Sequence, residues 1–120
     1  MAKHNELGRK GEEIALQHLK KNQYSILETN WRFGKDEIDI IAKKEDMLVI
    51  VEVKTRSSNY LTEPEFAVTK KKQGFIIRAA NAYIDKKDLE LECRFDIISI
   101  VVYPQDHTLE HIEDAFYPTL

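Results

Sequence analysis

Apolar residues recur every three to four positions in two stretches of the chain, which is the spacing of one face of an amphipathic helix. The first stretch covers residues 5–22, and Asn5 is a suitable N-terminal cap for it. The second follows Thr69, another capping residue, and runs to about Lys86. The pattern therefore predicts one helix near the start of the chain and one in its second half.

Four other segments have the alternation or the β-branched runs of strands, namely residues 25–33, 36–43, 48–55 and 93–102. The second and third are separated by a tight turn at residues 45–46 and predict a hairpin. The fourth is apolar enough to be buried on both faces. Residues 57–67 contain turn residues and a proline, so we expect a loop there. Beyond Pro104 the alternation is weak and predicts at most a short edge strand.

The order helix, three strands, helix, strand predicts an α/β fold in which helices pack on a mixed sheet. The length of 120 residues fits a single domain, residues 1–120, with a core at about 5–103 and an acidic tail at 104–120. The chain has one cysteine, Cys93, which we expect to be a buried, unreactive thiol. The polar N-terminus and the lack of a long apolar run predict a soluble cytoplasmic protein without membrane contact.

Three charged residues interrupt the apolar hairpin: Asp39, Glu52 and Lys54. Pairing about the turn joins positions whose numbers sum to 91, which sets Asp39 opposite Glu52. Like charges so placed repel each other. The repulsion would be relieved in one of three ways: one carboxyl is protonated, Lys54 lies between the two, or both bind one divalent cation. Mg²⁺ fits the last arrangement best, because it takes one or two carboxylates and completes its shell with water and phosphate oxygens.

A charged cluster on paired strands can also serve only to protect a sheet edge from aggregation. Two features favour a chemical role over protection. Leu48 and Ile50 share a face with Glu52 and Lys54, so one end of that face is buried. Glu12 borders the apolar stripe of the first predicted helix, and a third carboxylate converging on the hairpin is what a metal site would use.

The formal net charge of −3 argues, taken alone, against a nucleic-acid partner. The charge is unevenly distributed, however. Residues 1–35 and 54–82 are basic and flank the acidic hairpin, while residues 83–120 carry most of the excess negative charge. Because attraction depends on the local field, contact with nucleic acid stays open.

Five segments in the same order carry a resemblance to a known family: LGRKGEEIALQHL, NWRF…DEIDIIA, VEVKTR, AVTKKKQ…RAANAYI and RFDIISI. Together they resemble the YraN family of predicted endonucleases, within the PD-(D/E)xK superfamily and related in fold to archaeal Holliday-junction resolvases. The resemblance covers about residues 7–102. It implies a restriction endonuclease-like fold, Mg²⁺ or Mn²⁺ as cofactor, and cleavage of DNA, including branched DNA or repair intermediates. One departure is Asp36, where the family usually has Gly.

The resemblance also implies roles for individual residues. Asp39 and Glu52 would be metal ligands and Lys54 the catalytic lysine. Glu12 would be an accessory acidic residue of the catalytic site, bound to the metal through water. Lys72 and Gln73 match a pair that could reach the site or the phosphate backbone.

Further basic residues are candidate phosphate contacts. Lys70, Lys71 and Lys72 open the second predicted helix, where a phosphate would offset their unfavourable position at a helix N-terminus. A solvated helix end explains them equally well. Arg9, Lys10 and Arg56 are further candidates on the basic segments.

Three functions stay open from the residues alone: a metal-dependent nuclease, a nucleic-acid-binding module of the same fold that does not cleave, and a structural protein with an internal salt bridge in the hairpin. Symmetric cutting of a junction would require a homodimer. Trp31 and Tyr60 could stack on unpaired bases, although Trp31 suits the core better. His107 and His111, in the polar tail, are expected to face solvent rather than bind metal.

Overall fold

The computed structural model describes residues 2–59 and 68–118 of the chain. The elements are α1 (Ala2–Lys21), β1 (Ser25–Phe33), β2 (Asp36–Lys44), β3 (Met47–Ser57), α2 (Lys70–Lys87), β4 (Glu92–Val102) and β5 (His107–Phe116). Both helices and the first four strands thus lie close to where the sequence predicts them, but α1 begins at Ala2, so Asn5 lies within the helix and is not its cap. Neither helix in the described ranges is long and apolar enough to cross a membrane.

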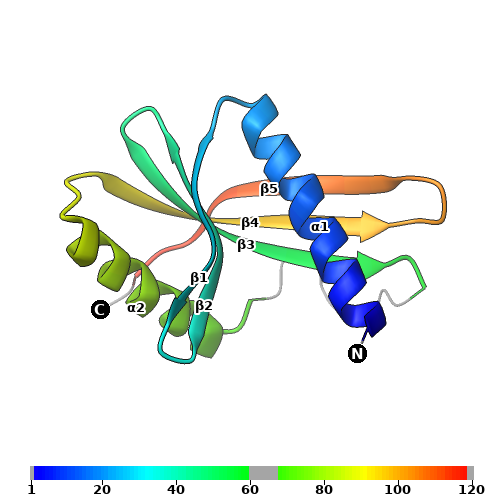
Figure 1. The fold of residues 1–120 in the computed structure, drawn as a ribbon, viewed down its shortest axis with the longest axis horizontal. Helices are drawn as coiled ribbons and strands as arrows, with labels where there is room; N and C mark the ends of the chain where they lie inside the picture. Colours follow the sequence, from blue (N-terminus) through cyan, green and yellow to red (C-terminus); the bar gives the residue numbers. More distant parts are fainter. Residues whose placement is uncertain (1, 60–67, 119–120) are drawn as a thin grey trace.

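The five strands form one sheet whose order follows the chain, β1-β2-β3-β4-β5. β3 and β4 are parallel, and all other neighbours are antiparallel. A parallel pair needs a crossover connection, and α2 lies in the connection between β3 and β4. The mixed sheet with its two helices confirms the predicted α/β, restriction endonuclease-like fold (Figure 1).

The two helices cover opposite faces of the sheet. Ala15 and Leu19 of α1 pack with alternate residues of β2, β3 and β4 in one core, and Ile76 and Ala80 of α2 pack with the other set. Figure 1 shows α1 lying across β3 and β4, with α2 beside the turn that joins β1 and β2. Because the central strands are buried on both faces, their sequences read as nearly continuous apolar runs.

α1 approaches β3 closely at Gly11. A Cβ atom at this position would overlap the side chain of Thr55 in β3, so a larger residue would push the helix away. Glu12 follows directly in α1, and Lys54 directly precedes Thr55. The close approach therefore brings the predicted acid of α1 near the strand that carries the hairpin charges.

The β1–β2 ribbon turns away from β3 part-way along its length (Figure 1). β2 pairs with β3 as far as Ile40, which lies opposite Val51, whereas its pairing with β1 continues to Asp36. Ile40 packs in the α1-side core but Ile38 packs in the α2-side core, so the strand twists sharply between them. Asn30 of β1 has a φ of 51° beside this twist. Asp39 therefore lies where the sheet branches.

The end of the chain differs from the prediction of a polar tail. β5 has 10 residues and pairs along β4. Its Phe116 is buried and stacks on Phe95 of β4, with ring centroids 5.2 Å apart. The core therefore extends past residue 103. The alternation of β5 is weak because one of its inward-facing residues, His111, is polar and bonds to a buried carboxylate.

Candidate functional site

Asp39 and Glu52 are neighbours at the branch between β2 and β3. Ile40 lies opposite Val51, so the observed pairs have numbers that sum to 91, as predicted. The backbone pairing ends there, one position before Asp39 and Glu52. Asp39 Oδ2 accepts a 2.8 Å hydrogen bond from the backbone N–H of Val53 in β3. A side-chain oxygen thus satisfies a β3 amide at the point where the backbone of β2 turns away.

The two carboxyls are poorly solvated. The Glu52 side chain is 13% exposed, and its Oε1 is buried with no hydrogen-bond partner of normal geometry among the described residues. Burial raises the pKa of Asp39 to about 8, and the neighbouring negative charge of Glu52 contributes to the increase. Without a cation, Asp39 therefore carries a proton at neutral pH, which is one of the three arrangements that the sequence left open.

A small pocket opens beside Glu52 at the start of α2. It has a volume of about 220 Å³ and is lined by Glu52, Lys54, Val68, Thr69 and Lys72. Lys72 Nζ lies 3.6 Å from Glu52 Oε2. Thr69 caps α2 by accepting a 3.1 Å hydrogen bond from the backbone N–H of Lys72, which fixes where that side chain begins. Two of the predicted lysines are thus brought to one pocket with a predicted ligand.

The other predicted contacts on this side lie around the pocket. The Gln73 side chain donates a 2.9 Å hydrogen bond to the Val68 carbonyl, so it stabilises the start of α2. Lys70 and Lys71 are exposed on the first turn of α2. Arg56 follows Lys54 by two residues in β3 and therefore shares its face of the sheet. Arg56, Lys70, Lys71 and Lys72, on the two elements that line the pocket, are called the basic rim below.

Glu12 reaches towards Asp39 from α1. Burial and, next, the charge of Asp39 raise the pKa of Glu12, while a 3.1 Å hydrogen bond from Asn30 Nδ2 opposes the increase. No three His, Cys, Asp or Glu side chains of residues 2–59 and 68–118 are grouped closely enough to hold a metal ion. Sequence reasoning missed Asn30 and also Glu37, whose charge further raises the pKa of Glu12.

With this geometry established, the relatives of the chain are informative. The sequence model described as "Uncharacterised protein family UPF0102" matches residues 11–100. The chain belongs to the UPF0102 family. A UPF0102 protein of Flavobacterium psychrophilum is 52% identical over 117 residues, covering 98% of both chains. UPF0102 proteins of Flavobacterium johnsoniae and Parabacteroides distasonis are 49% and 47% identical, each covering 98% of this chain and 98% or 97% of their own. UPF0102 corresponds to the YraN-like family, so the resemblance read from the sequence is confirmed.

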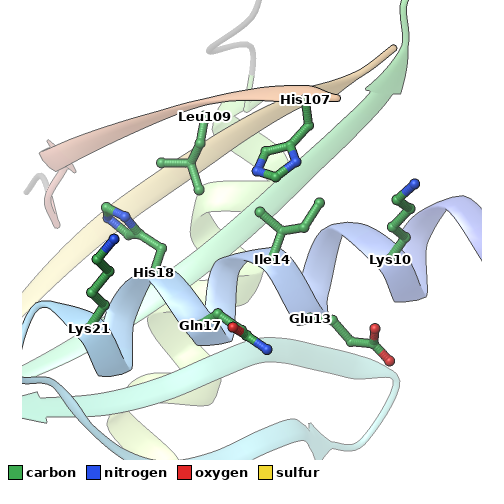
Figure 2. A pocket seen from close by; sticks show the side chains of 8 residues that line it. All are labelled: Lys10, Glu13, Ile14, Gln17, His18, Lys21, His107 and Leu109. Carbon is green, nitrogen blue, oxygen red and sulfur yellow. The ribbon is translucent and has the colours of Figure 1, made fainter. Parts of the chain in front are cut away.

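The UPF0102 match includes Asp39, Glu52 and Lys54 but begins after Arg9 and Lys10. Both of these basic residues are exposed on α1, on the opposite face of the sheet from α2. Figure 2 shows Lys10 at one end of a groove of about 550 Å³ between α1 and β5. The groove is lined by Lys10, Glu13, Ile14, Gln17, His18, Lys21, His107 and Leu109. The predicted phosphate contacts thus fall on two separate surfaces.

Asp96 of β4 is the centre of a buried hydrogen-bond network that was not predicted from the sequence. Its carboxylate accepts hydrogen bonds of 2.9 and 2.8 Å from Arg94, 2.7 Å from His111 Nε2 and 3.0 Å from the backbone N–H of Asp114. Burial alone would raise the pKa of Asp96, but these bonds outweigh it and lower the pKa. An acid in a β-branched run, with Arg94 two residues earlier on the same face, is the signal that could have revealed the network.

The network corrects the prediction for His111. Its side chain is 11% exposed, and its Nδ1 lies 3.0 Å from Nε2 of His18 in α1. His107, by contrast, is exposed as predicted. Arg94 also donates a 2.7 Å hydrogen bond to the hydroxyl of Tyr24, which follows α1. The network therefore ties β4, β5 and the end of α1 together, away from the Asp39–Glu52 pair.

The remaining sequence predictions concern Trp31, Cys93 and Tyr60. Trp31 packs against the α2-side core and lies edge-on to Tyr83, with centroids 5.2 Å apart, so the core assignment is correct. Burial and the charge of Asp96 raise the pKa of the half-buried Cys93 thiol to about 12, which agrees with an unreactive thiol. Tyr60 lies outside the described residues.

Proposed function

We propose that the protein is a metal-dependent endonuclease that hydrolyses phosphodiester bonds of DNA, with Asp39 and Glu52 as the ligands of Mg²⁺ or Mn²⁺. The observation that carries the proposal is the buried carboxyl pair. Within the described structure, Glu52 Oε1 is buried without a hydrogen-bond partner of normal geometry, and burial raises the pKa of the neighbouring Asp39 to about 8. A divalent cation would replace the proton on Asp39 and satisfy the Glu52 oxygen.

The donor set suits Mg²⁺ in particular. Two protein carboxylates leave most of the octahedral positions to water and phosphate oxygens, which is the coordination that Mg²⁺ prefers. The 220 Å³ pocket beside Glu52 gives space for a phosphate. When bound, such a metal polarises the phosphate and lowers the pKa of a coordinated water.

The chain's own residues divide the remaining tasks. Lys54 lines the pocket, where its ammonium would offset charge that develops on the phosphate. Lys72 holds the Glu52 carboxylate at 3.6 Å and would move towards a phosphate that enters. Glu12, whose pKa burial and the charge of Asp39 raise, would contact the metal through water. Lys70, Lys71 and the other members of the basic rim would bind neighbouring phosphates.

A second candidate function is binding of nucleic acid without cleavage. The raised pKa of Asp39 favours it, because a proton can neutralise the pair in place of a metal ion. In that case the basic rim would still bind phosphates, and metal ions would change neither the stability nor the affinity.

The two candidates are separated by incubating the protein with linear, flapped and four-way DNA, with Mg²⁺, with Mn²⁺ and with EDTA. We expect metal-dependent cleavage by wild type and none by Glu52→Gln or Lys54→Ala. Glu110→Gln, which neutralises an exposed acid on β5, is the matched control and should cut like wild type. Melting temperatures show whether each variant is folded. Salt-sensitive binding with no cleavage by wild type would support the second candidate, and failure to bind or cut any DNA would refute both.

A further inference from the structure

Phe33 is an exposed aromatic ring at the tip of the β1–β2 ribbon. It is the last residue of β1, the residue is 45% exposed, and Gly34 with a φ of 62° follows it in the turn. A single exposed apolar side chain is ordinary on a protein surface. The surroundings of this one are not ordinary, because other aromatic rings hold it in place.

A row of three aromatic rings leads from the α2-side core to Phe33. Tyr83 of α2 is 3% exposed, and Trp31 lies edge-on to it. The rings of Trp31 and Phe33 are parallel within 1°, with centroids 6.4 Å apart. The outer ring is thus supported by a fixed inner one, and little side-chain entropy would be lost if a flat group stacked on it.

Exposed basic side chains lie in the same part of the molecule, where two of them pair with Glu37 and Asp36. Arg32 precedes Phe33 with a side chain that is 77% exposed, and Lys35 is exposed in the turn. Arg78 of α2 lies 3.8 Å from Asp36, the residue paired with Phe33, and is 57% exposed. Aromatic rings interleaved with cations are the features with which proteins bind single-stranded nucleic acid.

The position of the ring relative to the carboxyl pair fixes what it can reach. Phe33 lies opposite Asp36, three residues from Asp39 on the same strand. Three residues of a strand span about 10 Å. Stacked DNA advances about 3.4 Å per nucleotide and an unstacked strand advances further, so the ring lies at most about three nucleotides from a phosphate held at Asp39.

We propose that Phe33 stacks on an unpaired base of the bound DNA, so that the protein prefers single-stranded or branched DNA with unpaired bases over blunt duplex. The face of a base is accessible to a protein ring only where neighbouring bases do not cover it, which excludes the interior of a duplex. The identity of the bound polymer rests on the proposed function. The stacking contact adds the structural class of DNA that is selected.

The test is a titration in EDTA, which keeps the DNA intact, with labelled single-stranded DNA, a duplex with a three-nucleotide flap, and a blunt duplex. Phe33→Ala should weaken binding of the first two by ~5- to 150-fold, as removal of a stacking ring does, and leave the blunt duplex unchanged. Phe33→Trp should restore the affinity. Leu27→Ala, which removes a side chain of β1 that is 39% exposed, is the matched control and should have no effect. Trp31 is the only tryptophan, so its fluorescence reports directly on stacking next to it.

The outcomes separate this inference from the proposed function. If Phe33→Ala leaves all three affinities unchanged while wild type still cleaves DNA with metal, the stacking inference alone is wrong. An equal loss on all three DNAs also overturns it, because the contact would then not select unpaired bases. If wild type binds no DNA, the proposed function fails as well. Self-association that depends on Phe33, measured by sedimentation velocity without any effect on DNA binding, would assign the ring to a contact between protein copies.

Discussion

Replacement of Asp39 by Asn tests the electrostatics of the carboxyl pair most directly. Asn has nearly the shape of Asp and keeps an oxygen that can accept the 2.8 Å hydrogen bond from the Val53 N–H. It removes the negative charge and the ability to take up a proton. The local structure should therefore persist while the repulsion at Glu52 disappears.

The size of the effect follows from the pKa of Asp39, which is about 8 in the folded protein against an ordinary value of 3.8. At pH 7 the unfolded chain carries the ionised group, whereas the folded protein must hold a proton on it. Each pH unit above the ordinary pKa costs about 1.36 kcal/mol, so the cost at pH 7 reaches about 4 kcal/mol. In EDTA, Asp39→Asn should therefore be more stable than wild type by up to about 4 kcal/mol.

The pH dependence has a definite sign. Because the folded pKa lies above the unfolded one, the folded state binds the extra proton between about pH 4 and pH 8. The contribution of this proton is fully present below pH 4 and is lost as the pH rises through 8. Wild type should lose stability across that window, and Asp39→Asn should lack this part of the slope.

Urea unfolding at pH 5, 7 and 9, in EDTA and in Mg²⁺, measures the stability difference between the two proteins, its pH dependence and the effect of the metal. Metal at 100 times its dissociation constant should stabilise wild type by about 2.7 kcal/mol and leave Asp39→Asn unchanged. Asp46→Asn, an exposed acid in the hairpin turn, should stay within about 0.5 kcal/mol of wild type under every condition. If Asp39→Asn is destabilised in EDTA at pH 7, or keeps the full pH slope of wild type, the reasoning about the buried pair is wrong.

Three further changes have defined outcomes. Gly11→Ala should destabilise the fold by ~1–3 kcal/mol in urea unfolding, and Thr55→Gly in the same chain should restore most of that loss, since the overlap is with the Thr55 side chain. Asp96→Ala should cost ~3–5 kcal/mol by the same measurement, because Arg94 would be left without its buried counter-ion. Lys72→Met should reduce the slope of log affinity for DNA against log salt by about 1, and an unchanged slope would remove Lys72 from the phosphate contacts.

The candidate site could be predicted from the sequence because a hairpin fixes its own register. The turn at residues 45–46 and the alternation of two strands were enough to place Asp39 next to Glu52. The departure of β2 from β3 was not predictable, because it depends on the twist of the β1–β2 ribbon and on which core receives Ile38. The raised pKa of Asp39 depends on that geometry, so the sequence left protonation of one carboxyl as only one of three arrangements.

The sequence predictions were wrong about β5 and His111, where polar side chains are buried in the protein interior. Periodicity detects strands through apolar side chains, and in β5 one of the inward positions is His111, which bonds to Asp96. The apolar periodicity of α1 predicted the extent of the helix. It did not predict that Arg9 and Lys10 lie on the opposite face of the sheet from α2, because that depends on how the helix packs across the sheet. Long-range polar contacts of this kind leave little trace in a local pattern.

The acidic strand β5 has a consequence for shortened forms of the protein. β4, beside it, has seven consecutive buried residues, Phe95–Val101, and β5 covers its otherwise open side. In a chain truncated at residue 103, β4 would be an exposed apolar edge strand. We expect that chain to aggregate instead of forming a smaller stable domain. The carboxylates of β5 keep this edge of the sheet solvated and contribute to the low isoelectric point of the protein. The isoelectric point is therefore a poor guide to whether the other end of the sheet attracts nucleic acid.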